Sequence, residues 1–166
     1  MANEKFKTLN DLFLHELRDL YSAETQLMEA LPKMAEAAHD ENLKAAFNHH
    51  LEETKGQKER LDIISQILSE GLDGETCEAM KGLIKEGEES VHLDADSDVK
   101  DAALIASGQR VEHYEMAGYG TAVHFADRVG NKEVRDLLQE TLQEEKHADS
   151  KLNDLATNSI NEKASV

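Results

Sequence analysis

Apolar residues recur every three to four positions along most of this chain, the spacing that places them on one face of an α-helix. The first such pattern begins near Thr8, where the letters TLND resemble a capping box, and extends to about His39. Pro32 is expected to interrupt and kink it. A second pattern covers about residues 40–70. Together they predict a helical hairpin over about residues 8–70.

Helical spacing also dominates the second half of the chain. A shorter segment over about residues 75–92 carries its apolar residues on one side and is interpreted as a crossover helix that packs on a bundle. A third long pattern reaches Val129, and a fourth runs to about Ala156. We therefore predict a second hairpin over about residues 98–157, followed by a frayed tail that starts at Asn158.

Length and composition agree with one helical domain. Domains of this size, 166 residues, bury roughly 70% of their unfolded surface, which is enough for a sizeable core. The chain has one proline, no tryptophan and only 4% aromatic residues, a composition that favours helix over sheet. We predict a single all-α domain over residues 1–166, a four-helix bundle with a short crossover helix between the second and third main helices.

The net charge and the length of the apolar runs limit which molecules this protein is expected to bind. The formal net charge of −17 argues against binding to nucleic acid or to anionic membranes. No apolar run approaches the ~20 residues of a membrane span, and the first residues lack the apolar stretch of a signal peptide. A cytoplasmic location is therefore expected. The single cysteine, Cys77, cannot form an internal disulfide and is interpreted as a small buried hydrophobic residue.

Each long helix places one glutamate inside its own apolar stripe. Because successive helical residues turn by ~100°, Glu24, Glu115 and Glu145 each lie at the centre of a stripe. Glu53 lies about 40° from the stripe residue Gln57 and faces inward less centrally. All four glutamates stand near the middle of their helices, so we expect them to meet at one level of the bundle.

Four glutamates at one level need a compensating charge. An uncompensated buried carboxylate costs several kcal/mol, and neighbouring carboxylates repel one another. No lysine or arginine occupies the centre of a stripe. Two divalent cations supply the missing charge, and carboxylate-rich coordination suits Fe or Mn. The alternative is a polar core of protonated or tyrosine-bonded glutamates, with Tyr21 and Tyr119 as donors.

Four further side chains extend the predicted ligand set. Gln57 and Asp149 each stand one turn beyond the inner glutamate of their helix, and Glu112 lies ~60° from Glu115. His50 is the histidine that most nearly faces the interior. The candidate metal-binding residues are Glu24, Glu53, Glu115, Glu145, Glu112, Gln57, Asp149 and His50.

The histidine pattern of dimetal bundles is only partly present. Such bundles take one Glu from each of two helices and a Glu-x-x-His from each of the other two. Glu144-x-x-His147 has these letters, but His147 lies ~160° from Glu145 and is expected to face solvent. The inward glutamates match this class of protein, and the histidines do not.

Five stretches carry a specific combination of motifs. They are LFxHxLxDxYxAExQL over 12–27, HLEETKGQ over 50–57, DAALIA over 101–106, VEHYExAxYGT over 111–121 and LxEEK over 142–146. Together they resemble the YciF type of stress-induced, ferritin-like protein family, and the resemblance covers nearly the whole chain. It implies the ferritin-like fold related to rubrerythrin, a homodimer, and a dinuclear iron or manganese site on the inward glutamates.

Two functions follow from these observations. The first is a ferritin-like stress-response protein whose two bound metal ions, Fe or Mn, react with peroxide or dioxygen. The second is a non-enzymatic helical bundle with a structural or partner-binding role in stress. Whether the chain is an enzyme is left open at this stage.

Overall fold

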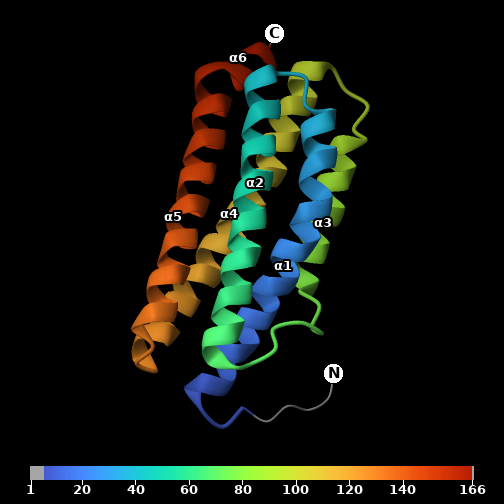
Figure 1. Cartoon of the computed structure of the whole chain (residues 1–166). Coiled ribbons are helices and arrows are strands. Elements are labelled where there is room, and N and C mark those ends of the chain that lie inside the picture. The colour runs from blue at the N-terminus through green and yellow to red at the C-terminus, as the bar shows by residue number, and fades with distance from the viewer. Residues whose placement is uncertain (1–5, 166) are drawn as a thin grey trace.

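The chain folds into four long helices and a shorter crossover helix, as a computed structural model that describes residues 6–165 shows (Figure 1). This confirms the predicted all-α fold class. The long helices are α1 (Leu9–Ala37), α2 (Glu41–Leu68), α4 (Ser97–Arg128) and α5 (Lys132–Leu155), and the crossover helix is α3 (Glu78–Val91).

The long helices pair as two hairpins. α1 packs against α2, and α4 packs against α5, while α3 lies along α1 and α4 on one side of the bundle (Figure 1). The chain descends through α2, rises through α3 and descends again through α4, so α2 and α4 run in the same direction. One long crossover between two hairpins is the topology of ferritin-like bundles.

Helix α1 begins where it was predicted to begin, but it is not interrupted at Pro32. Thr8 Oγ1 accepts a hydrogen bond from the Asp11 backbone N–H, and the Asp11 carboxylate accepts one from the Thr8 backbone N–H, which completes a capping box. The predicted interruption at Pro32 is wrong, because α1 continues through it to Ala37. Pro32 lies on the exposed face near the end of the helix, where a carbonyl that loses its partner can turn toward water.

The C-terminal segment is ordered, so the predicted frayed tail from Asn158 is also wrong. A π-helical turn over Ala156–Ile160 is followed by the short helix α6 over Asn161–Lys163. Ile160 is 1% exposed and packs into the core, and Lys163 Nζ lies 3.1 Å from Asp40 Oδ2 at the start of α2. Burial of this isoleucine holds the segment against the bundle although most of its other residues are polar.

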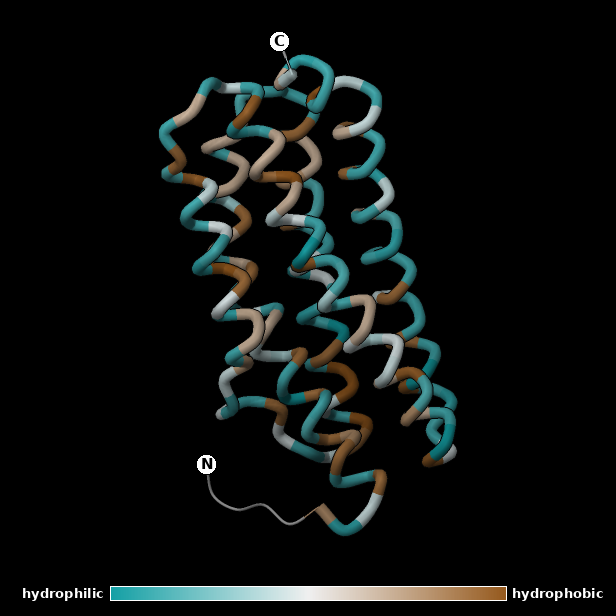
Figure 2. The backbone as a smooth tube through the Cα atoms, turned by 180° about the vertical axis from the view of Figure 1, so that it is seen from behind, coloured by the Kyte–Doolittle hydropathy of each residue, from teal (hydrophilic) through white to brown (hydrophobic). Residues whose placement is uncertain are grey.

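Two apolar clusters form the core, and a polar layer separates them. The upper core gathers around Phe47 and Leu104, and the lower core gathers around Phe13 and Leu138. Most of the buried polar side chains fall between the two, with at least one from each long helix, among them Glu24, His50, Gln57, Glu112, Glu115 and Glu145. Figure 2 shows apolar and polar residues alternating along every helix. Within residues 6–165, no helix is both apolar enough and long enough to cross a membrane.

The connection into α3 is held by a polar cluster that the sequence did not predict. Cys77 is buried, as expected, but it is not simply a hydrophobic residue, because its Sγ caps the N-terminus of α3 through the Met80 backbone. Cys77 Sγ also lies 3.1 Å from Asp19 Oδ2 and 3.0 Å from the Tyr114 hydroxyl. Asp19 reaches Cys77 because α3 packs along that side of α1.

Candidate metal centre

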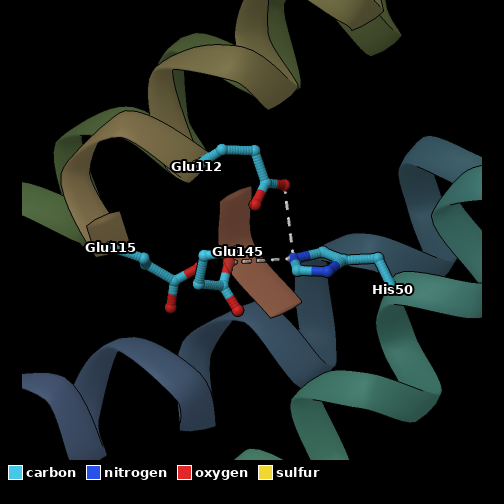
Figure 3. Close-up of side chains that lie close together, drawn as sticks. All are labelled: His50, Glu112, Glu115 and Glu145. Atoms are coloured by element: carbon cyan, nitrogen blue, oxygen red, sulfur yellow. Dashed lines mark ion pairs between the residues drawn. The ribbon is translucent and has the colours of Figure 1, made fainter. Parts of the chain in front are cut away.

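Four buried side chains from three helices converge in the polar layer. His50 comes from α2, Glu112 and Glu115 come from α4 one turn apart, and Glu145 comes from α5 (Figure 3). One potential ligand atom from each lies within 4.8 Å of the other three. His50 Nε2 is 3.3 Å from Glu112 Oε1 and 3.9 Å from Glu145 Oε2. Carboxylate oxygens and an imidazole nitrogen at this separation are a donor set for a metal ion.

The remaining long helix, α1, contributes Glu24, which is fully buried beside this cluster. Tyr119 donates a hydrogen bond from its hydroxyl to Glu24 Oε1, so one of the two tyrosines proposed as donors has that role. The other, Tyr21, instead accepts a hydrogen bond from Lys58 Nζ. Glu24 thus keeps one oxygen free of a protein partner, and that oxygen is available to a ligand.

Gln57 and Arg60 orient the carboxylates of α5. Gln57 Nε2 donates to Glu145 Oε1 and, at 3.0 Å, to Glu144 Oε2. Arg60 binds Glu144 with both terminal nitrogens at 3.0 Å and also donates to Thr141. The guanidinium therefore neutralises Glu144 near the surface and makes no ion pair with the buried glutamates within residues 6–165.

Polar atoms without partners are concentrated in this layer, which tests whether the residues fit a metal. Both Glu115 oxygens, both His50 nitrogens and one oxygen each of Glu24, Glu112 and Glu145 are buried without a hydrogen bond. In the described part of the chain, the other such atoms are Thr54 Oγ1 and Gln57 Oε1 on the same stretch of α2. Native interiors satisfy nearly all buried polar atoms. The residues fit a site that a cation completes.

Comparison with known proteins places this arrangement in a family. The chain matches DUF892, described as a domain of unknown function, over residues 8–165. The protein belongs to the DUF892 family. It is 49% identical over 159 residues to YciF of Escherichia coli K12, covering 95% of this chain and 96% of that protein. The resemblance inferred from the motifs is therefore confirmed.

Solved structures support the same assignment. The crystal structure of the E. coli stress protein YciF matches with a TM-score of 0.91 at 48% identity and covers 94% of this chain and 99% of that chain. YcfI from Rhodopseudomonas palustris matches with a TM-score of 0.87 at 44% identity, covering 92% and 98% of the two chains. A Xanthomonas campestris protein, 19% identical with a TM-score of 0.74, covers 96% of this chain and 100% of its own and shares the fold.

Three of the buried carboxyls of this DUF892 protein have raised pKa values. Burial raises the pKa of Glu24, Glu112 and Glu115 well above the ordinary value. The neighbouring charge of Glu145 raises the pKa of Glu24 and Glu112 further, and Glu24 adds to the pKa of Glu115. Like charges crowded in a low dielectric oppose ionisation. A cation here would relieve both the burial cost and the repulsion.

His50 confirms the prediction of an inward histidine. It is 4% exposed. Burial alone opposes its charged form, yet Glu53 and Glu145 raise the pKa of His50 above the ordinary value. Its two nitrogens face different partners, because Nδ1 lies 3.6 Å from Glu53 Oε2 while Nε2 faces Glu112. His147, which completes the Glu-x-x-His motif that begins at Glu144, is exposed, as its helical angle predicted.

Two predicted site residues stand at the edge of the cluster. Glu53 has a side chain that is 19% exposed, and its Oε1 lies 3.3 Å from His49 Nε2. Asp149 is 22% exposed and accepts a hydrogen bond from Gln109 at 3.2 Å, with His113 Nε2 at 3.3 Å. Glu53 was predicted to face inward less centrally than the other three glutamates, and it lies at the edge of the cluster, whereas His50 belongs to the cluster itself. The sequence signal for the inward position of His50 was its place near the middle of the apolar stripe of α2.

Proposed function

We propose that this DUF892 protein is a stress-response protein that binds two divalent metal ions, iron or manganese, in its polar layer. The observation that carries the proposal is the group of buried carboxylate and imidazole atoms without hydrogen-bond partners. Four ionised glutamates, Glu24, Glu112, Glu115 and Glu145, would carry a charge of −4 that two divalent ions neutralise. The description of its relative YciF as a stress protein supports the biological role.

The donor set favours iron or manganese over other ions. Carboxylate oxygens dominate it, which suits Mn²⁺ and Fe²⁺, and the single imidazole adds a nitrogen that Mg²⁺ and Ca²⁺ sites rarely use. No thiolate lies in the set, because Cys77 is bound to Asp19 and Tyr114 instead. The chemistry that such ions supply when bound is electron exchange with a small oxidant such as peroxide or dioxygen.

The side chains of the protein prepare the site for that chemistry. Tyr119 orients Glu24, and Gln57 orients Glu145, so each carboxylate presents a defined oxygen to the interior. The apolar cores above and below exclude bulk water, and this strengthens the attraction between a cation and the carboxylates.

The homodimer implied by the family resemblance remains a prediction, as does the absence of a nucleic-acid partner.

Metal uptake by chelator-treated protein tests the proposal. The wild type should retain about two equivalents of Fe²⁺, loaded without oxygen, or of Mn²⁺ after gel filtration, as expected for a carboxylate-bridged bundle. Free ion at 100 times the Kd should add about 2.7 kcal/mol per bound ion to the free energy of unfolding. Glu24→Gln and Glu115→Gln should abolish retention, whereas Glu52→Gln, at an exposed position on α2, should leave it unchanged.

Two results separate the alternatives. A wild type that retains neither ion, with the fold intact by circular dichroism, contradicts the metal site and leaves protonated glutamates in a polar core. A protein that retains metal but consumes peroxide and dioxygen no faster than its Glu115→Gln variant contradicts the oxidative reaction. In that case the bundle is non-enzymatic and the ions stabilise it.

A further inference from the structure

A pocket between α2 and α5 leads from the surface to the buried cluster. Its inner wall includes His50 and Glu112, which are members of the cluster. Its outer wall includes His49, Glu53 and His147, which reach solvent to different extents. The same pocket is thus lined by candidate ligands and by exposed side chains, so it joins the two.

Glu53 bridges the exposed and the buried imidazole in this pocket. Its Oε1 lies 3.3 Å from His49 Nε2, and its Oε2 lies 3.6 Å from His50 Nδ1. Side-chain exposure falls from 57% at His49 through 19% at Glu53 to 5% at His50. Nitrogen and oxygen donors therefore follow one another from solvent to the interior with a carboxylate between two imidazoles.

The inner end of the pocket has buried atoms free to receive a cation. Both nitrogens of His50 and Oε2 of Glu112 are buried without a hydrogen bond. His50 is 4% exposed and Glu112 is 2% exposed. Since both residues line the pocket, an ion held at its outer wall has ligands within reach on the inner side.

The other approaches to the cluster are less suitable for a cation. On the side of Gln57, Glu144 comes near the surface, but the Arg60 guanidinium covers it at 3.0 Å. A cation approaching there meets a guanidinium placed directly on the carboxylate. Lys151 also lines the pocket between α2 and α5, but it forms no ion pair with Glu53 or Glu112 within residues 6–165, so both carboxylates stay accessible to a cation. The pocket formed by α1, α3 and α4 is mainly apolar, with Leu27, Ile84 and Val111 among its lining residues, and none of the four converging side chains lines it.

We propose that divalent transition-metal ions reach the buried site between α2 and α5, held first by His49 and Glu53 and then passed to His50 and Glu112. The proposal rests on the metal-binding function proposed above and assigns Glu53 to uptake rather than to the final ligand set. Imidazole nitrogen next to carboxylate oxygen favours transition ions over Mg²⁺ or Ca²⁺, which prefer oxygen ligands. His147, on the same outer wall, is a further nitrogen donor along this path.

Uptake kinetics test this route with Co²⁺ alone, followed by its visible absorption after rapid mixing with chelator-treated protein. His49→Ala and Glu53→Gln should slow uptake by about tenfold, at the low end of the range by which charged clefts accelerate the arrival of ions. A group that acts only on the path changes uptake and release by the same factor, because both directions cross the same barrier. Release of bound Co²⁺ to excess chelator should therefore slow equally, with an unchanged Kd and amount bound.

The matched control is Glu52→Gln, which removes the same charge from an exposed residue of α2 that pairs with Lys55 and does not line the pocket. Its uptake rate should equal that of the wild type. Unchanged rates in both His49→Ala and Glu53→Gln, with normal binding, overturn the route and leave the metal site standing. A raised Kd in Glu53→Gln, without the matching fall in release rate, also overturns it and makes Glu53 a ligand of the bound ion. A wild type that takes up no Co²⁺, Fe²⁺ or Mn²⁺ overturns the route and the proposed function together.

Discussion

Glu115 shows at the level of one residue how the site conflicts with the stability of the bundle. It is fully buried, and neither of its oxygens has a hydrogen-bond partner. Burial first, and the charge of Glu24 next, raise the pKa of Glu115 well above the ordinary value. Without metal, ionisation of this side chain destabilises the fold. A residue of this kind is better suited to binding a cation than to packing.

The pH dependence of the metal-free protein follows from that shift. Because the folded state binds the Glu115 proton more tightly than the unfolded state does, its contribution is fully present below the unfolded pKa of about 4.3. It is lost as the pH rises through the higher folded pKa. In excess chelator, the Glu115→Gln variant should therefore gain stability relative to the wild type as the pH rises, reaching about 1–2 kcal/mol.

Urea unfolding of both proteins at a series of pH values measures this difference. The comparison reports the ionisation of Glu115 together with its repulsion of Glu24, Glu145 and Glu112, because these groups titrate as a coupled set. A difference in the free energy of unfolding that stays constant from acidic to alkaline pH would show that Glu115 ionises normally in the folded state. That outcome would remove the electrostatic argument for a bound cation.

At the level of helices, close contact between α1 and α4 brings Tyr119 to Glu24. Gly118, beside Tyr119, faces Leu20 of α1 so closely that an added Cβ would lie 2.8 Å from Leu20 Cδ2. Leu20 is 1% exposed and has little free space to move into. Gly120, two residues further along α4, has nothing within 4 Å of an added Cβ. Only the first glycine serves helix packing.

Alanine substitutions at these two glycines should therefore have opposite effects. Gly118→Ala should destabilise the protein by about 1–2 kcal/mol, since overpacking exceeds the gain in helix propensity. Gly120→Ala should stabilise it by about 0.5–1 kcal/mol, because propensity acts there without a clash. Urea midpoints compare the two directly. Equal stabilisation by both substitutions would mean that Leu20 moves at little cost and that close packing of α1 on α4 is not required.

For the whole molecule, the surplus of acidic over basic side chains causes electrostatic repulsion that the tertiary structure only partly offsets. The formal net charge is −17 over 166 residues. Surface ion pairs such as Lys33 with Glu88 and Arg135 with Asp127 offset some of it, but exposed pairs contribute little stability. Repulsion among the remaining surface carboxylates is long-ranged and is weakened by salt.

Salt should consequently stabilise the metal-free protein. Raising NaCl from about 0.02 M to about 0.3 M, in the presence of chelator, shortens the screening length and should raise the urea midpoint of unfolding. The chelator prevents trace divalent ions from producing the same effect by binding. A midpoint that falls with salt would mean that ion pairs such as Arg60 with Glu144 outweigh the general repulsion.

Much of the fold and part of the site were predictable from the sequence, because both depend on positions within single helices. The inward direction of Glu24, Glu115 and Glu145 follows from their angle to the apolar residues of the same helix, and all three are fully buried. The same reasoning identified His50 as inward and His147 as exposed. It could not show that Asp19 contacts Cys77, because that contact depends on how α3 packs against α1.

The sequence alone determined the four long helices and the crossover helix, their apolar faces and the burial of acidic groups near the middle of the bundle, since periodicity is a local property. Only the tertiary structure decided that His50 and Glu112 join Glu115 and Glu145 while Glu53 turns toward His49. It also decided that a pocket opens between α2 and α5. These outcomes depend on the relative rotation and axial offset of neighbouring helices and on side-chain rotamers, which contacts between distant parts of the chain select.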